Sequence, residues 1–164
     1  MSATTPPQPT PAAPATPPRP RRRRFFRVCL ALLRILTLVH AALCIAQPIT
    51  MGQYLAGNLD IITWHGVGGD GIVFIALLMI FVAVLYAIAG GRVWIAVVVP
   101  ILFLVEGFQV GMGWSRQLGI HVPLGVGVVV ASILLAIIVW LPRASRDRRS
   151  AVAAGSPADS GARS

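Results

Sequence analysis

Four apolar runs, each close to the length of a membrane-spanning helix, constrain this chain more than any other feature. They cover about residues 26–47, 61–89, 93–112 and 120–141. A helix needs ~20 apolar residues to cross ~30 Å of hydrocarbon. Because the bilayer core offers no water to backbone groups, such runs must form helices. The sequence therefore predicts an all-α integral membrane protein, a four-helix up-down-up-down bundle.

The composition agrees with this class. The chain has 164 residues, of which 56% are hydrophobic and 12% are charged. A soluble domain of this size needs more charge to cover its surface. The formal net charge of +9 could indicate a nucleic-acid partner, but the arginines gather at the ends of the apolar runs, where they meet anionic headgroups. We expect the lipid bilayer as the partner and no nucleic acid.

Two polar tails flank the predicted transmembrane domain of residues 25–142. Residues 1–24 are rich in proline and arginine, and residues 143–164 resemble them in polarity. Such segments bury too little apolar surface to offset the entropy of ordering. Both tails are predicted to be disordered.

The placement of the arginines predicts the orientation in the membrane. The connection before the second apolar run carries no basic residue, and the connection before the fourth carries only Arg116. Cytoplasmic segments carry the excess of basic residues. We therefore expect a multi-pass protein of the plasma membrane with both termini in the cytoplasm. The arginines that support this are Arg19, Arg21 to Arg24, Arg27, Arg92, Arg143, Arg146, Arg148 and Arg149.

A duplicated pattern relates the two predicted helical hairpins. The copies read Gln47 … Met51-Gly52 … His65-x-x-x-Gly69 and Gln109 … Met112-Gly113 … His121-x-x-x-Gly125. A repeated hairpin in a membrane implies two halves related by a pseudo-two-fold axis. Helices two and four are diagonal neighbours in an up-down-up-down bundle. We expect His65 and His121 to face each other at one depth.

Two facing imidazoles favour a haem site. Neutral imidazole ligates haem iron, and two of them leave no open axial position, which suits electron transfer. Gly69 and Gly125 share the face of their histidines one turn later and would leave room for a porphyrin edge, although small residues also serve close helix packing. The prediction is a b-type haem with His65 and His121 as iron ligands, exchanging electrons with a quinone or a partner subunit.

Two further ionisable residues, His40 and Glu106, lie inside predicted helices one and three. A charge within the membrane costs roughly 2.5 kcal/mol or more, so such groups usually have a partner or a role. They could orient a ligand histidine, lie on a proton path, or form a buried pair that holds the two helices together. Cys29 and Cys44 are about 22 Å apart on one helix, too far for a disulfide. We expect both cysteines to be packing residues.

Two other functions stay open. The sequence holds no P-loop, GxSxG or HExxH motif, so no catalytic residue is assigned. The chain could be a cofactor-free structural or interaction protein of the membrane, with the histidines as interhelical hydrogen-bonding groups. It could also be a proton-coupled transporter subunit that uses His40 and Glu106.

The segments ALCIAQPITMGQYLAGNLDIITWHGVGG and EGFQVGMGWSRQLGIHVPLGVGVV resemble the two hairpin regions of one four-helix half of haem A synthase. The resemblance covers about residues 26–141 and implies a haem-binding bundle with His65 and His121 as axial ligands. The family carboxylate one turn before the second-helix histidine would fall at Ile62, so the resemblance implies haem binding rather than haem A synthesis. In organisation the chain is also similar to small actinobacterial-type four-helix membrane proteins of unknown function.

Overall fold

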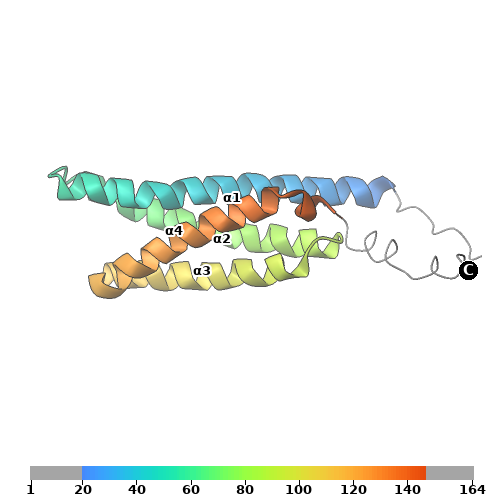
Figure 1. Cartoon of the computed structure of the whole chain (residues 1–164). Coiled ribbons are helices and arrows are strands. Elements are labelled where there is room, and N and C mark those ends of the chain that lie inside the picture. Colours follow the sequence, from blue (N-terminus) through green and yellow to red (C-terminus); the bar gives the residue numbers. More distant parts are fainter. Residues whose placement is uncertain (1–19, 147–164) are drawn as a thin grey trace, which may run out of the picture.

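The computed structural model describes residues 20–146 as a bundle of four long helices (Figure 1). Within this range it holds no strand, so the predicted all-α fold is confirmed. All four helices are long and apolar enough to cross a membrane, which indicates a small multi-pass membrane protein. The elements are α1 Pro20–Leu55, α2 Ile61–Ile88, α3 Val93–Trp114, α4 Leu118–Trp140 and a short 3-10 helix, η1 Pro142–Ser145.

The helices run alternately in opposite directions, as an up-down-up-down bundle requires. Helix α1 packs against α2 and α4, and α3 packs against the same two helices. Helices α2 and α4 are therefore diagonal across the core, as predicted. We call the end with the α1–α2 and α3–α4 connections the hairpin end. The opposite, terminal end carries the α2–α3 connection and both ends of the described chain (Figure 1).

Helix α1 is longer than the predicted 26–47 at both ends. Pro20 stands at the first helical position, where a missing N–H costs nothing, and the arginines that follow favour helix. Residues 20–24, predicted as tail, are therefore helical. At its other end α1 continues through Pro48, because one proline removes a single intrahelical bond.

The predicted tails fall largely beyond the described chain. Residues 1–19 and 147–164 lie outside the described residues, so the disorder predicted for them stays a prediction. The second tail was expected to begin at residue 143. Instead, η1 follows α4 directly, because Pro142 fixes a backbone angle that suits a helical first turn.

One closing motif ends the first three long helices. Gly57, Gly90 and Arg116 adopt left-handed φ values of 101°, 113° and 57°. In each case the next residue donates its amide to the carbonyl five positions earlier, at 2.8–3.1 Å. This Schellman geometry satisfies carbonyls that the helix end would leave free. Gly57 and Arg116 close the two hairpins at equivalent places, so the sequence repeat is also a structural one.

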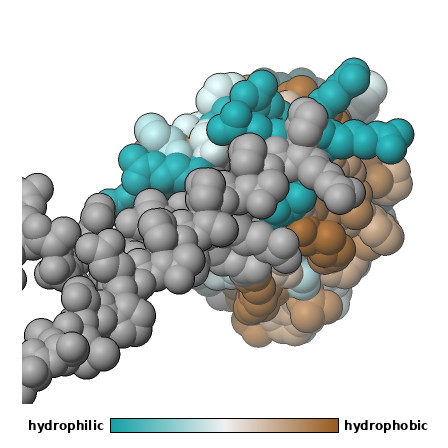
Figure 2. Space-filling model, turned by 90° about the vertical axis from the view of Figure 1, so that its right-hand side faces the viewer, coloured by the Kyte–Doolittle hydropathy of each residue, from teal (hydrophilic) through white to brown (hydrophobic). Residues whose placement is uncertain are grey.

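Arginine side chains satisfy the helix ends at the terminal end. Arg34 donates through Nε to the carbonyl of Val139 at 3.2 Å, and its guanidinium stacks 5.2 Å from the ring centre of Trp140. Arg22 similarly bonds to the carbonyl of Ala89, at the end of α2. A positive charge is favourable beside the negative end of a helix dipole. Figure 2 looks onto this end and shows hydrophilic residues gathered on it.

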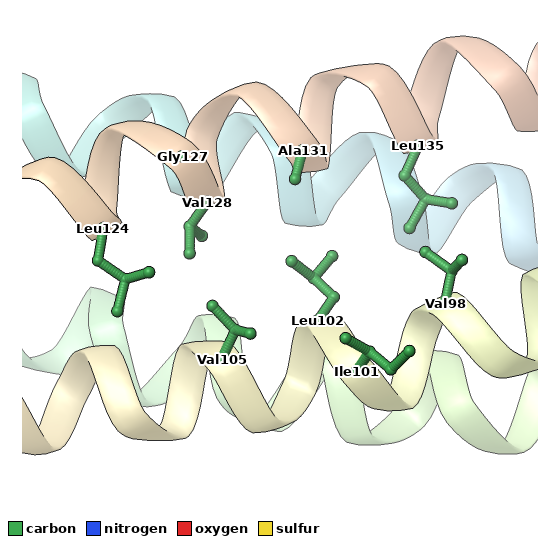
Figure 3. A pocket seen from close by; sticks show the side chains of 9 residues that line it. All are labelled: Val98, Ile101, Leu102, Val105, Leu124, Gly127, Val128, Ala131 and Leu135. Atoms are coloured by element: carbon green, nitrogen blue, oxygen red, sulfur yellow. The ribbon is translucent and has the colours of Figure 1, made fainter.

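An apolar groove lies between α3 and α4 in the middle of the bundle, with a volume of about 210 Å³. Val98, Ile101 and Leu102 line it from α3 (Figure 3). Leucines, valine, alanine and glycine complete it from α4. It offers no polar side chain, whereas polar groups meet at two other places inside the bundle.

Candidate functional site

His65 and His121 meet near the hairpin end. His65 lies in the first turns of α2 and His121 in the first turn of α4. Their ring centres are 6.3 Å apart, and the ring planes differ by 66°. Both side chains are partly buried. The bundle therefore brings together the two histidines that the repeat singled out, from diagonal helices.

The His65 ring is held by α1. Its Nδ1 atom lies 3.3 Å from the carbonyl oxygen of Gln47 and 3.1 Å from the hydroxyl of Thr50. That hydroxyl donates its own hydrogen to the Gln47 carbonyl at 2.8 Å. Because both oxygens are then available only as acceptors, Nδ1 carries the proton and donates it.

The His121 ring is held by α3 in the corresponding way. Its Nδ1 donates to the carbonyl oxygen of Gln109 at 2.9 Å. The side-chain amide of Gln109 donates back to the His121 carbonyl at 2.8 Å. Gln109 thus forms the interhelical bond that its position favours, and it fixes both the backbone and the ring of His121.

These bonds leave the two Nε2 atoms free. With the proton on Nδ1, a neutral imidazole carries its lone pair on Nε2. Within the described residues, no hydrogen-bond partner faces Nε2 of His65 or of His121. This is the form in which histidine binds metals, with the other ring nitrogen tied to a carbonyl. We call the five residues His65, His121, Gln47, Thr50 and Gln109 the histidine layer.

Glycines leave room for the side chains of the histidine layer, and they include Gly113 in addition to the predicted Gly125. A Cβ atom at Gly113 would lie 2.8 Å from Cε1 of His121. A Cβ at Gly125 would lie 2.7 Å from the side-chain nitrogen of Gln109, so Gly125 makes room for that amide. Gly69 faces Val110 at an ordinary 3.7 Å. The place beside a porphyrin edge that was predicted for Gly69 and Gly125 stays a prediction.

A second polar group, which we call the inner cluster, consists of His40, Cys44 and Glu106. Their exposed fractions are 0%, 1% and 1%. Nε2 of His40 lies 2.9 Å from Oε1 of Glu106, and Nδ1 of His40 lies 3.9 Å from Sγ of Cys44. His40 and Glu106 thus form the predicted buried pair between α1 and α3, which are diagonal helices.

The contact between His40 and Glu106 is short but poorly aligned. At 2.9 Å the two atoms are at ion-pair distance, yet the direction of the ring N–H does not satisfy a hydrogen bond. Oε2 of Glu106 has no hydrogen-bond partner at all among the described residues. The pair therefore leaves buried polar atoms unsatisfied, which is uncommon in folded proteins.

Three members of these groups gave no sufficient signal in the sequence. Cys44 packs in the apolar interior, as expected, but it also stands four residues after His40 and so shares its helix face. Cys29 packs in the apolar core, as expected. Thr50 gave no signal of its own. Gly113 was part of the duplicated Met-Gly pair, but only contact with the His121 ring gives it a role.

The comparisons with known proteins give no further assignment. No protein-family model matches the chain, and no curated protein or solved structure matches it either.

Proposed function

We propose that the chain is a b-type haem protein of the plasma membrane, with His65 and His121 as the iron ligands. It would pass electrons to or from a quinone or a partner subunit. The observation that carries the proposal is the pair of facing imidazoles, each with its Nδ1 proton donated to a carbonyl and its Nε2 without a partner. A bound haem would supply one-electron chemistry at its iron.

The spacing of the rings fits an iron between them. Two iron–nitrogen bonds of about 2 Å, with about 1.1 Å from each nitrogen to its ring centre, separate the ring centres by about 6.2 Å. The ring centres of His65 and His121 are 6.3 Å apart. Rotation of a ring about the ligand axis leaves this distance unchanged, so the 66° between the ring planes is compatible.

The surrounding residues have defined tasks in this proposal. The carbonyls of Gln47 and Gln109 accept the Nδ1 protons, which fixes the tautomer and makes Nε2 a stronger donor to a metal. Gly113 lets α3 approach the His121 ring. A haem held by both His65 and His121 would supply electron transfer rather than reactions of a bound substrate.

The charge distribution and the family resemblance support the same picture. The terminal end carries nearly all arginines of the described chain, while the hairpin end carries only Arg116. The positive-inside rule therefore favours cytoplasmic termini, with the histidine layer near the opposite surface. The resemblance to one half of haem A synthase points to the same two histidines.

One observation favours a cofactor-free structural protein as the second candidate. Each imidazole already bonds to the neighbouring helix, and such bonds contribute about 0.6–2 kcal/mol in membranes. The histidines would then stabilise the two hairpins, and the free Nε2 atoms would have no task. Haem binding separates the two candidates, because only the first needs both Nε2 atoms.

The test is absorption spectroscopy of the purified chain. The full chain is expressed with ample haem, purified in detergent and compared with His65→Ala, His121→Ala and, as a control, the double variant His40→Leu/Glu106→Leu, which removes the whole buried pair. We expect a Soret band in the wild type and in the control, and at least a tenfold loss in each of the other two variants. A wild type without the band, or equal bands in all four proteins, overturns the proposal.

A further inference from the structure

The unsatisfied atoms of the inner cluster converge from two helices. Four buried side-chain atoms lack a hydrogen-bond partner among the described residues, and three of them are Nε2 of His40 and the two carboxylate oxygens of Glu106. One ligand atom from each of His40, Cys44 and Glu106 lies within 4.8 Å of the others. Buried polar atoms rarely stay unpaired in folded proteins, and a bound ion would satisfy all three.

The repeat accounts for the meeting of these side chains. Cys44 and Glu106 each stand three residues before the glutamine of their own hairpin, Gln47 and Gln109. The pseudo-symmetry that brings His65 to His121 therefore also brings Cys44 to Glu106, about 4.5 Å further inside the bundle. His40, one turn before Cys44 on α1, completes the group.

We propose that His40, Cys44 and Glu106 bind a divalent transition-metal ion of the zinc class. A thiolate, a neutral imidazole and a carboxylate are all ligands of such ions. Three protein ligands leave a fourth position for water or for another ligand, as in open zinc sites. This site is separate from the histidine layer and does not depend on the proposed haem.

The charges of the three ligands favour a doubly charged ion. One thiolate and one carboxylate together carry two negative charges, so a divalent cation makes the site neutral. Neutrality matters because an uncompensated charge is expensive to bury in a membrane. On binding, the ion displaces the thiol proton of Cys44 and the proton that His40 and Glu106 share as a buried pair, and both protons leave to the solvent.

The geometry requires only a small contraction. Ligand atoms around a tetrahedral ion with bonds of about 2.0–2.3 Å lie about 3.3–3.8 Å apart. The Sγ–Nδ1 distance is 3.9 Å, and the widest separation in the group is within 4.8 Å. Nε2 of His40, which lies 2.9 Å from Oε1 of Glu106, must also turn toward Cys44, because a single ring nitrogen binds the ion. Rotation of the imidazole and of the Glu106 side chain supplies the remaining movement of about 1 Å.

Cobalt provides the probe, because a thiolate bound to Co²⁺ gives a charge-transfer band in the near ultraviolet. The full chain, purified in detergent without haem and stripped with a chelator, is titrated with Co²⁺ and then with Zn²⁺. We expect the band in the wild type, its displacement by Zn²⁺ and one bound ion per chain by elemental analysis. Cys44→Ser should abolish the band and weaken binding at least 100-fold, because even outer partners of ligands account for about 10–100-fold.

Matched variants distinguish a metal site at Cys44 from metal binding elsewhere in the chain. Cys29→Ser removes the other buried cysteine of α1 and should leave the band intact. The double variant His65→Ala/His121→Ala should also keep the cobalt band. The test of the metal site therefore does not depend on whether the chain binds haem. Circular dichroism checks that each variant is folded. A folded wild type without the band, or a band that survives Cys44→Ser or disappears with Cys29→Ser, overturns the proposal.

Discussion

The histidine layer and the inner cluster are neighbours in one bundle, but they are built in different ways. In the histidine layer both hairpins contribute the same residue, and each ring is tied to a glutamine carbonyl. In the inner cluster the equivalent positions have diverged, with Cys44 on one hairpin and Glu106 on the other. The layer is partly open, whereas the cluster is fully buried. The repeat thus provides one symmetric pair, and its equivalent positions one turn away provide a mixed set of polar side chains.

The two regions should differ most in how much stability is lost when one partner of a contact is replaced. Glu106→Leu leaves the His40 ring buried without its acidic partner, which should lower the free energy of unfolding by about 3–5 kcal/mol. Without haem, His65→Ala should cost about 1–2 kcal/mol, because its bonds are at a half-open site. Denaturation of the metal-free and haem-free proteins in mixed detergent, followed by circular dichroism, measures both.

The double variant His40→Leu/Glu106→Leu is the control for this experiment. Replacing a whole buried pair by apolar residues is often neutral, so most of the loss should be recovered. If Glu106→Leu is no more damaging than His65→Ala, the inner cluster is not the tightly coupled pair that its burial indicates.

Gly113→Ala tests the histidine layer through a position that binds nothing itself. The new Cβ would lie 2.8 Å from the His121 ring, so the ring must move away from its carbonyl partner. We expect at least tenfold lower haem retention and a loss of about 1–3 kcal/mol from overpacking. Gly111→Ala, on the same helix with open space around it, is the matched control. Equal haem content in both variants would show that the position of His121 does not matter for binding.

Gly125→Ala should have a smaller effect, because it acts on the Gln109 side chain rather than on a histidine. Displacement of the amide removes its 2.8 Å bond to the His121 carbonyl. Interhelical bonds of this kind average about 0.6 kcal/mol and reach about 1.7 kcal/mol in membranes. Thermal unfolding compares it with Gly127→Ala, where nothing lies within 4 Å of the added Cβ. If Gly127→Ala lost more thermal stability than Gly125→Ala, the result would contradict the contact between Gly125 and the Gln109 amide.

The smallest expected effect is a gain in stability from a substitution at the hairpin end. Arg116 has a φ of 57° at a place where the other hairpin has Gly57. A left-handed conformation costs a non-glycine residue about 1–2 kcal/mol. Arg116→Gly should therefore raise the free energy of unfolding by up to about 1 kcal/mol, after the greater backbone freedom of glycine in the unfolded state is deducted. Gly57→Ala, tested in the same way, should lower the free energy of unfolding.

The sequence was sufficient for the fold because hydrophobic length and duplication are encoded locally. The four apolar runs predicted the helices, and the repeated Gln and His positions predicted which helices face each other. Helix ends were less predictable. The first helix was predicted to end at Gln47, but packing in a membrane tolerates the internal Pro48, and the closing signal is Gly57 instead.

The details of the two polar sites depended on contacts between helices, which no local pattern contains. Thr50 reaches His65 only because α1 continues beyond Pro48, to Leu55. Cys44 joins His40 through a spacing that is also typical of ordinary core packing. The role of Gly113 requires the position of a ring from another helix. Sequence reasoning therefore identified the symmetric pair and left the asymmetric cluster incomplete.

Electron paramagnetic resonance of the oxidised, haem-loaded chain tests most directly whether two imidazoles hold one iron. With His65 and His121 both bound, the ferric iron should give a low-spin spectrum, and His65→Ala or His121→Ala should each convert residual haem to a high-spin or exchangeable form. A high-spin spectrum in the wild type, or a low-spin spectrum that persists when both histidines are replaced, would contradict bis-histidine ligation in the histidine layer.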